Sequence, residues 1–508
     1  MDNNQLPTKF DLIVIGTGLI ESILSAAASR IGKTVLHIDS NDYYGCNWAS
    51  FNLQTLHNFT VSKLETDNSD DDCLRIGNNL FDIKNFKTTW HFSDAQSNNP
   101  EETEISVTQE DLLAHSRRFN IDLVPKIHYA RGDFVQLLIS SNIARYVEYR
   151  SVSRVLTYLN GQLEVVPCSR SDVFANNKVS VIEKRMLMKL LTSLEKIEER
   201  LQDENQCKKS FFEFLKDERL SPSLIHYVLY AMARCENNDS VKQGIESTKR
   251  FLHSLGRFGK TPFLFSLYGS GETAQAFCRL SAVFGAIFAL NQTSLKGLKT
   301  TDEKLTHILN GDQEIFAEQF VLGAQYAPQK FMKKLEIQQF ISRAVFITDR
   351  SLLPSEQEHL TLLMFPPEEG KNLITIIEMG HLTGTCPKGF YLVHLTSKQI
   401  SSPHEDFQHV VQKLFNHEDK EAPAILWSCY FSLPGIDNLD VCESLPENLF
   451  LCSGPDLDLD YDASIKKAKE IFIKMYPDLE FLPRAPDPEE IIIGDDHEAE
   501  NKEEDKSV

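Results

Sequence analysis

The sequence predicts an α/β (α+β) protein in which a Rossmann-type domain carries an additional mixed sheet and a smaller all-helical domain. Three observations predict this fold. An apolar strand over residues 10–15 ends at Gly16 and Gly18, as in a βαβ unit that binds a dinucleotide. Leucine and isoleucine recur at helical spacing between residues 187 and 201. Runs of β-branched and aromatic residues return after residue 345, which is typical of a second sheet.

The first unit carries the dinucleotide fingerprint in a degenerate form. Its second strand, residues 34–38, ends on Asp39, where the ribose-binding carboxylate of such a unit belongs. Glu21, however, replaces the third glycine of the fingerprint that Gly16 and Gly18 begin. Because a diphosphate is bound there by bare backbone N–H groups, a glutamate adds bulk and a negative charge that repels phosphate. We therefore expect a retained βαβ fold and a lost cofactor.

Composition limits the function classes that remain. At 508 residues the chain is too long for one compact core, so two or three subdomains are expected. A net charge of −21 argues against nucleic acid as a partner, because nucleic acid requires clustered Lys and Arg. Ten scattered cysteines without a C-x-x-C pair favour a reduced, cytosolic protein. No long apolar run and no signal pattern is present, so no membrane span is expected.

Apolar runs bounded by turn residues indicate the strands of the larger domain. They are residues 154–158, 163–166, 345–348, 360–364, 390–395 and 449–452, and a helix over residues 463–475 follows the last of them. In the helical region, Ser221 and Pro222 predict a capped helix start with proline at its first position. The expected domains are residues 1–170 and 247–485 (larger, discontinuous), 172–246 (helical) and 486–508 (acidic, disordered tail).

The sequence offers no catalytic or metal-binding set. Its histidines form no H-E-x-x-H pattern, and there is no G-x-S-x-G elbow. The segment 259–261 fails the phosphate-loop pattern, because Ser254 stands where that pattern requires glycine. Alternating aspartates over residues 456–462 lack the glycine and the terminal glutamate of a calcium loop. We therefore expect no catalytic residue, no metal and no cofactor.

Two features are candidates for recognition of a protein partner. The segment Tyr268–Glu272 is expected to open a helix that runs to about Leu290, with Phe277, Leu280, Phe284 and Ile287 on its apolar face. Another face carries Glu272, Gln275 and Arg279 at helical spacing, either as a binding stripe or as an ordinary solvated face. Tyr44 follows Asp39 at the edge of the sheet where α/β folds place binding groups, and its ring either binds or caps the core.

Several segments resemble the superfamily of Rab GDP-dissociation inhibitors and Rab escort proteins. Those typical of the whole superfamily are Asp11–Ser22, Val35–Asp39, Tyr43–Gly45 and Leu267–Glu272. Those that favour the escort branch are Asn47–Phe51, Arg118–Val124, Val166–Phe174, Glu183–Leu190, Ile341–Val345, Tyr391–Leu395 and Cys452–Pro455. The sequence departs from the family pattern at Cys46 and at the pair Thr273–Ala274, which lie beside these segments. The resemblance therefore does not indicate which Rabs would bind best.

The resemblance implies a flavoprotein-like domain that binds no flavin, with a smaller helical domain. By similarity, Tyr44, Glu272, Gln275 and Arg279 form the platform that binds a Rab. The helical domain would shelter geranylgeranyl groups and contact the transferase through Phe211 or Phe212, a buried aromatic anchor.

The function that the resemblance implies is that of a non-catalytic escort. It would bind new GDP-bound Rab GTPases, present them to Rab geranylgeranyl transferase and carry the prenylated product to membranes. Two rivals remain at this point. A GDP-dissociation inhibitor would recycle prenylated Rabs without engaging the transferase, and a flavin-dependent oxidase would bind the cofactor that Glu21 opposes.

Overall fold

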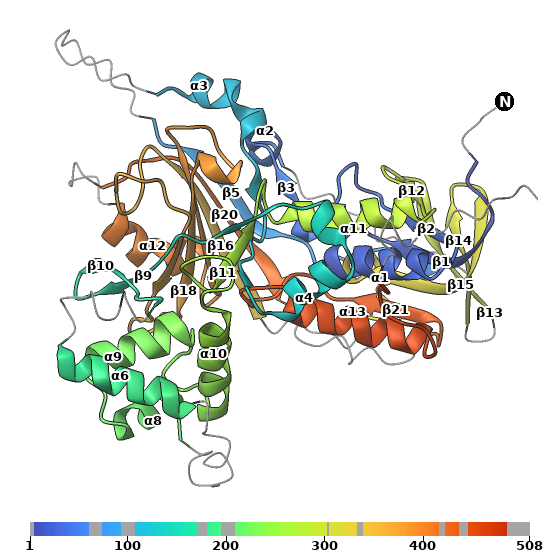
Figure 1. Ribbon diagram of the computed structural model, residues 1–508. Coiled ribbons are helices and arrows are strands. Elements are labelled where there is room, and N and C mark those ends of the chain that lie inside the picture. Colours follow the sequence, from blue (N-terminus) through green and yellow to red (C-terminus); the bar gives the residue numbers. More distant parts are fainter. Residues whose placement is uncertain are drawn as a thin grey trace, which may run out of the picture.

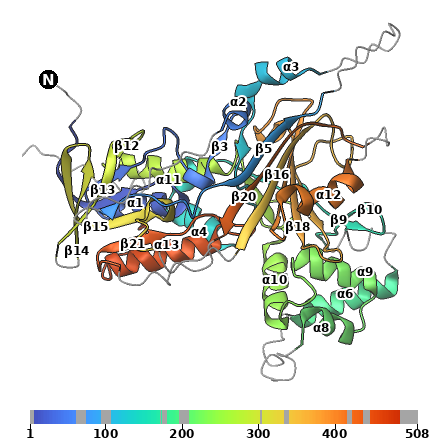
Figure 2. The same cartoon turned by 180° about the vertical axis from the view of Figure 1, so that it is seen from behind.

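The computed structural model describes residues 5–59, 74–92, 107–169, 172, 180–194, 209–301, 304–332, 339–415, 422–435 and 445–484. Within these residues the chain forms two large sheets and a group of helices (Figure 1). In Figure 1 and from behind in Figure 2, the helical group lies beneath the second sheet, away from the first. The predicted acidic tail, residues 486–508, lies outside the described residues. None of the described helices is long and apolar enough to cross a bilayer.

The first sheet contains the predicted βαβ unit. Its parallel strands are β1 (Lys9–Ile15), β2 (Val35–Ile38), β12 (Ile287–Ala289), β15 (Gln313–Gly323) and β21 (Leu449–Cys452). The antiparallel strands β14 (Lys304–Asn310), β13 (Leu295–Thr301) and β4 (Leu74–Arg75) extend it beyond β15. Strand β21 confirms the strand predicted at residues 449–452, and its pairing with β15 brings the C-terminal segment into the first sheet.

Helix α1 (Leu19–Arg30) lies between two other helices, α11 (Gly271–Val283) and α13 (Asp462–Met475). Every α1 residue from Leu19 to Ser29 is buried. The small side chains that follow Leu24 allow this close approach, since Ser25 Oγ lies 2.8 Å from Ser281 Oγ of α11. The first unit is therefore fixed by packing on both sides of its helix.

The second sheet is mixed and has the order β10-β9-β17-β18-β19-β16-β20-β5. Its strands are β5 (Lys84–Trp90), β9 (Arg154–Leu159), β10 (Gln162–Val165), β16 (Gln339–Thr348), β17 (Thr361–Phe365), β18 (Ile374–Met379), β19 (Tyr391–Lys398) and β20 (Ile425–Gly435). The strands predicted in this sheet are confirmed, and two of them, β9 and β10, pair antiparallel on either side of Gly161.

Short elements connect these layers. The strands are β3 (Ser50–Phe51), β6 (Ile121–Asp122), β7 (His128–Tyr129), β8 (Tyr149–Ser151) and β11 (Phe263–Ser266). The helices are α2 (Leu53–His57), α3 (Gln109–Ala114), α4 (Asp133–Ser140) and α12 (Pro403–Leu414), with 3-10 turns at Cys46–Trp48, Ser116–Arg118, Ile143–Arg145, Ala324–Tyr326 and His381–Thr383.

The helical group contains α6 (Val181–Leu194), α8 (Phe211–Asp217), α9 (Pro222–His226), the π-helix Tyr227–Met232 and α10 (Val241–Ser254). The predicted cap is confirmed, because the Ser221 side chain accepts from the Leu224 N–H and Pro222 follows it. The boundary predicted at residue 246 falls inside α10, whose buried face continues from Val241 and Ile245 to Phe251.

One predicted helix boundary is wrong. Helix α11 ends at Val283, not near Leu290, and Phe284 is exposed. Gly285 takes a left-handed φ of 94°, which ends the helix, because glycine has no Cβ to oppose that conformation. Ile287 belongs to strand β12 and pairs with Leu36 of β2. A strand contact thus replaces the position on the apolar helix face that was predicted for Ile287.

Candidate functional site

The turn between β1 and α1 is filled by a side chain of the protein itself. Gly16 has a φ of 98°, and Gly18 caps the start of α1. Glu21 bends back over this turn, so that a Cβ added to Gly18 would lie 2.5 Å from a carboxyl oxygen of Glu21. A Cβ added to Gly323 of β15 would also collide with the Glu21 carboxyl. The carboxyl thus lies against bare backbone where a diphosphate would bind.

The Glu21 carboxyl excludes a diphosphate by its volume. Glu21 is 4% exposed, and burial raises its pKa to about 8 from 4.5, with a further contribution from Asp39. Burial therefore favours the protonated form of Glu21 at neutral pH, so its bulk opposes a diphosphate more than its charge does.

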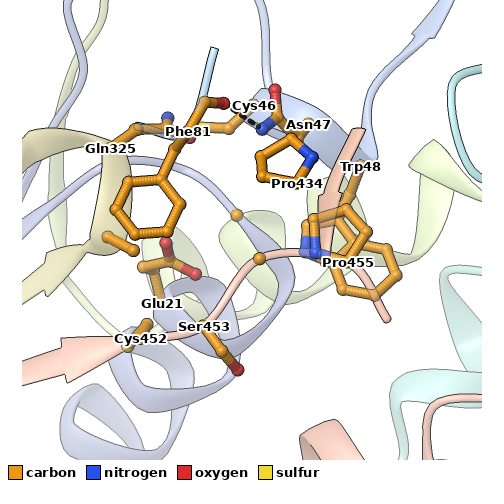
Figure 3. Close-up of a pocket in the computed structure, with 13 residues that line it drawn as sticks. Glu21, Cys46, Asn47, Trp48, Phe81, Gln325, Pro434, Cys452, Ser453 and Pro455 are labelled. Carbon is orange, nitrogen blue, oxygen red and sulfur yellow. Dashed lines mark hydrogen bonds between the residues drawn. The ribbon is translucent and has the colours of Figure 1, made fainter. Parts of the chain in front are cut away.

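The space that remains beside the turn is small. It measures about 10 Å³, room for a single water, and is lined by Glu21, Phe81 and Cys452 among others (Figure 3). Figure 3 shows the Glu21 carboxyl pointing into this space. The residues present therefore do not fit the diphosphate of a dinucleotide cofactor.

Asp39 is engaged by the protein itself. Its Oδ2 accepts both the N–H and the hydroxyl of Thr17 at 2.7 Å. Its Oδ1 accepts the Asn41 N–H at 2.8 Å and the Tyr326 hydroxyl at 2.5 Å. Tyr326 is buried, and burial raises the pKa of its hydroxyl well above the ordinary value. Sequence reasoning missed Tyr326, because nothing in its local sequence indicates a contact 287 residues away.

The predicted stripe forms the solvent face of α11. Gln275 and Arg279 are exposed and Glu272 is half-buried, whereas the residues between them are buried against the core. The Arg279 guanidinium lies 5.3 Å from the centre of the Tyr146 ring, which orients it. Burial raises the pKa of Glu272, and the nearby Asp122 adds to the increase. The stripe thus combines a cation, an amide and a carboxyl on one rigid helix.

Tyr44 lies beside the same helix. It is half-buried, with its ring 6.3 Å from the ring of Phe288. Burial raises the pKa of Tyr44, and the Cys278 thiol of α11 is close enough to contribute. The structure therefore brings Tyr44, from the loop after β2, next to the helix that carries the stripe.

The two phenylalanines predicted to contact the transferase have different environments. Phe211 is fully buried, stacks on Phe214 with ring centres 6.0 Å apart and packs against the backbone of Gly244. Phe211 therefore packs within its own helical group, and the assignment of the transferase contact to Phe211 or Phe212 stays a prediction. Phe212 is half-buried, with the Lys216 ammonium 4.1 Å above its ring, and is accessible from the surface.

The alternating aspartates hold the C-terminal segment in place. Asp456 pairs with the buried Lys126, whose Nζ lies 2.5 Å from a carboxylate oxygen. Asp460 and Asp462 both bind the Arg250 guanidinium of α10. Within the described part of the chain, no group of three or more His, Cys, Asp or Glu side chains is arranged to hold a metal.

Comparisons with known proteins place this geometry in a family. A family model described as GDP dissociation inhibitor matches residues 1–75, and one described as RAE1/2 domain I, C-terminal region, matches residues 341–457. The chain is similar to a Drosophila melanogaster protein named Rab proteins geranylgeranyltransferase component A, at 39% identity over 98% of this chain and 95% of that protein. The human component A 1 is 34% identical over 97% of this chain and 94% of that protein.

Solved structures support the fold alone. A Rab GDI from Plasmodium falciparum has a TM-score of 0.65 at 20% identity and covers 93% of this chain and 99% of that one. An oxidoreductase from Methanosarcina mazei has a TM-score of 0.54 at 11% identity and covers 91% of this chain and 99% of that one. The fold is thus shared by proteins named as a Rab GDI and as an oxidoreductase.

Proposed function

Because this chain belongs to the Rab escort protein family, the component A of Rab geranylgeranyltransferase, we propose that it binds GDP-loaded Rab GTPases and presents them to that transferase. It acts as an accessory component without an active site of its own. It keeps the prenylated Rab soluble in the cytosol and delivers it to membranes.

The observation that carries this proposal is the stripe on α11. Gln275 and Arg279 are exposed on a helix whose other residues are mostly buried, so their positions are fixed by the core of the protein. Arg and amide groups held on a fixed backbone suit recognition of a folded protein, because Arg is favoured at interface hot spots and its planar group is already arranged for hydrogen bonding. Tyr44 beside the helix supplies an aromatic ring to the same surface.

The turn between β1 and α1, which the Glu21 side chain fills, also supports the proposal. An oxidase would need its diphosphate site, which the Glu21 carboxyl fills. The transferase contact is assigned to Phe212 on α8, and the geranylgeranyl group to the helical domain predicted over residues 172–246. Each CH₂ of the lipid buried there contributes about 0.8 kcal/mol.

The test is the affinity for an unprenylated, GDP-loaded Rab, measured by titration calorimetry on the full chain. Arg279→Ala should lower the affinity at least tenfold, because it removes a charged hot-spot side chain worth about 2 kcal/mol. Lys469→Ala, an exposed cation on α13, is the matched control and should leave the affinity unchanged. Equal affinities for Arg279→Ala and wild type, with identical circular dichroism, would remove the platform assignment.

A further inference from the structure

Tyr268 has an unusual backbone for a bulky residue. Its φ is +66°, in the left-handed region, just before the start of α11. An aromatic residue rarely adopts this conformation, because its Cβ opposes the backbone. Leu482 shares the left-handed φ but is 3% exposed, so burial of its side chain offsets the cost. Tyr268 is 53% exposed, so burial offsets much less of the cost for this ring.

The surrounding backbone holds Tyr268 in this conformation. The Tyr268 N–H donates to the Thr383 carbonyl at 2.9 Å. The Ser266 hydroxyl donates to the Gly269 carbonyl at 2.6 Å. The Ser270 N–H donates to both oxygens of the buried Asp122 carboxylate at 2.9 Å. Strain that is retained by several independent contacts is a sign of a functional position.

The ring of Tyr268 lies on a bare backbone. Gly384, itself at a φ of +70°, has no side chain, and a Cβ added to it would come within 2.6 Å of the Tyr268 ring. On the same turn, Leu382 is 41% exposed, and its carbonyl accepts from Arg150 Nη1 at 3.1 Å. Tyr268 and Leu382 therefore form an exposed and rigid apolar surface, named here the Tyr268–Leu382 patch.

We propose that the Tyr268–Leu382 patch is the apolar anchor for the folded body of the GTPase that binds the α11 stripe. This inference rests on the proposed function. Only three residues separate Tyr268 from Glu272, so the patch continues the stripe along the chain. The stripe itself supplies charged and amide groups, and the half-buried Tyr44 adds one ring beside it. The Tyr268–Leu382 patch adds exposed apolar surface, and a specific interface needs an apolar core within a polar rim. A ring that is already oriented loses little entropy on binding, which suits a hot spot.

The test compares variants of the full chain in binding to a GDP-loaded Rab from which the flexible C-terminal tail has been removed. Tyr268→Asn removes the ring while keeping a residue that tolerates left-handed φ, and Leu382→Asn changes the patch at a position with ordinary backbone. Tyr268→Phe keeps the ring. Ile400→Asn is the control, because Ile400 is an apolar residue of matching exposure, 52%, in the loop before α12.

We expect Tyr268→Asn to lower the affinity at least tenfold, mostly through faster dissociation, and Leu382→Asn to lower it severalfold. Tyr268→Phe should stay within threefold of wild type, and Ile400→Asn should equal it. Unchanged affinity of both patch variants, with Arg279→Ala still weakened, would overturn the patch and leave the proposed function intact. Unchanged affinity of Arg279→Ala as well would count against the proposed function itself. A loss that appears only when the Rab retains its tail would also overturn the inference, because the patch would then serve the tail.

Discussion

Replacing Glu21 by glutamine should make the protein more stable relative to wild type as the pH rises. The folded protein holds the Glu21 proton up to about pH 8, whereas the unfolded chain loses it near 4.5. The unfolded state therefore gains stability from ionisation between these values, and wild type loses free energy of unfolding as the pH rises through this interval. Glutamine has nearly the same shape but does not ionise, so the variant lacks this loss.

The magnitude follows from the shift in pKa. Each pH unit within the interval corresponds to about 1.4 kcal/mol, so the stability difference between variant and wild type should change by about 3 kcal/mol between pH 5 and 7.5. Urea unfolding of both proteins at four pH values measures this difference. Titrating groups remote from Glu21 contribute equally to both proteins and cancel in it.

A difference that stays constant across this range would refute the reasoning. It would mean that the Glu21 carboxyl is ionised in the folded protein, and the exclusion of phosphate would then rest on charge after all.

Three further predictions concern side chains that differ in burial. Phe211→Ala should destabilise the protein by about 3–5 kcal/mol, because it leaves a cavity between Phe214 and Gly244. Phe212→Ala should change the free energy of unfolding by less than about 1 kcal/mol. It should weaken binding of the transferase, which titration calorimetry measures. Lys126→Met should lower the free energy of unfolding by about 3–5 kcal/mol, because the buried Lys126 ammonium pairs with Asp456.

These predictions have distinct contradicting outcomes. Full transferase affinity of Phe212→Ala would remove α8 as the contact surface. A stability loss of Phe211→Ala no larger than that of Phe212→Ala would contradict the buried position of the first ring. A Lys126→Met variant as stable as wild type would show that Asp456 accommodates its carboxyl without the ammonium.

The parts of the fold set by local sequence could be predicted from it. The βαβ unit follows from the apolar strands and the glycines between them, and the helix start at Ser221 follows from a side chain that caps its own backbone. The stripe on α11 could also be placed, because three residues at helical spacing share a face whatever the helix packs against.

Features that depend on distant contacts could not be predicted. Helix α11 ends where it does because Gly285 takes a left-handed φ and because Ile287, in β12, pairs with Leu36 of β2. Which of two adjacent phenylalanines is buried depends on the bare backbone of Gly244. The protonation of Glu21 depends on burial by segments hundreds of residues away, among them Cys452.

Reconstituted prenylation tests the central claim most directly. Purified Rab geranylgeranyl transferase, an unprenylated GDP-loaded Rab and labelled geranylgeranyl diphosphate are combined with and without this protein. Label should enter the Rab only when this protein is present, and Arg279→Ala should reduce the rate at limiting concentration. Absence of incorporation with the wild-type protein, under conditions in which the human component A 1 supports it, would contradict the assignment.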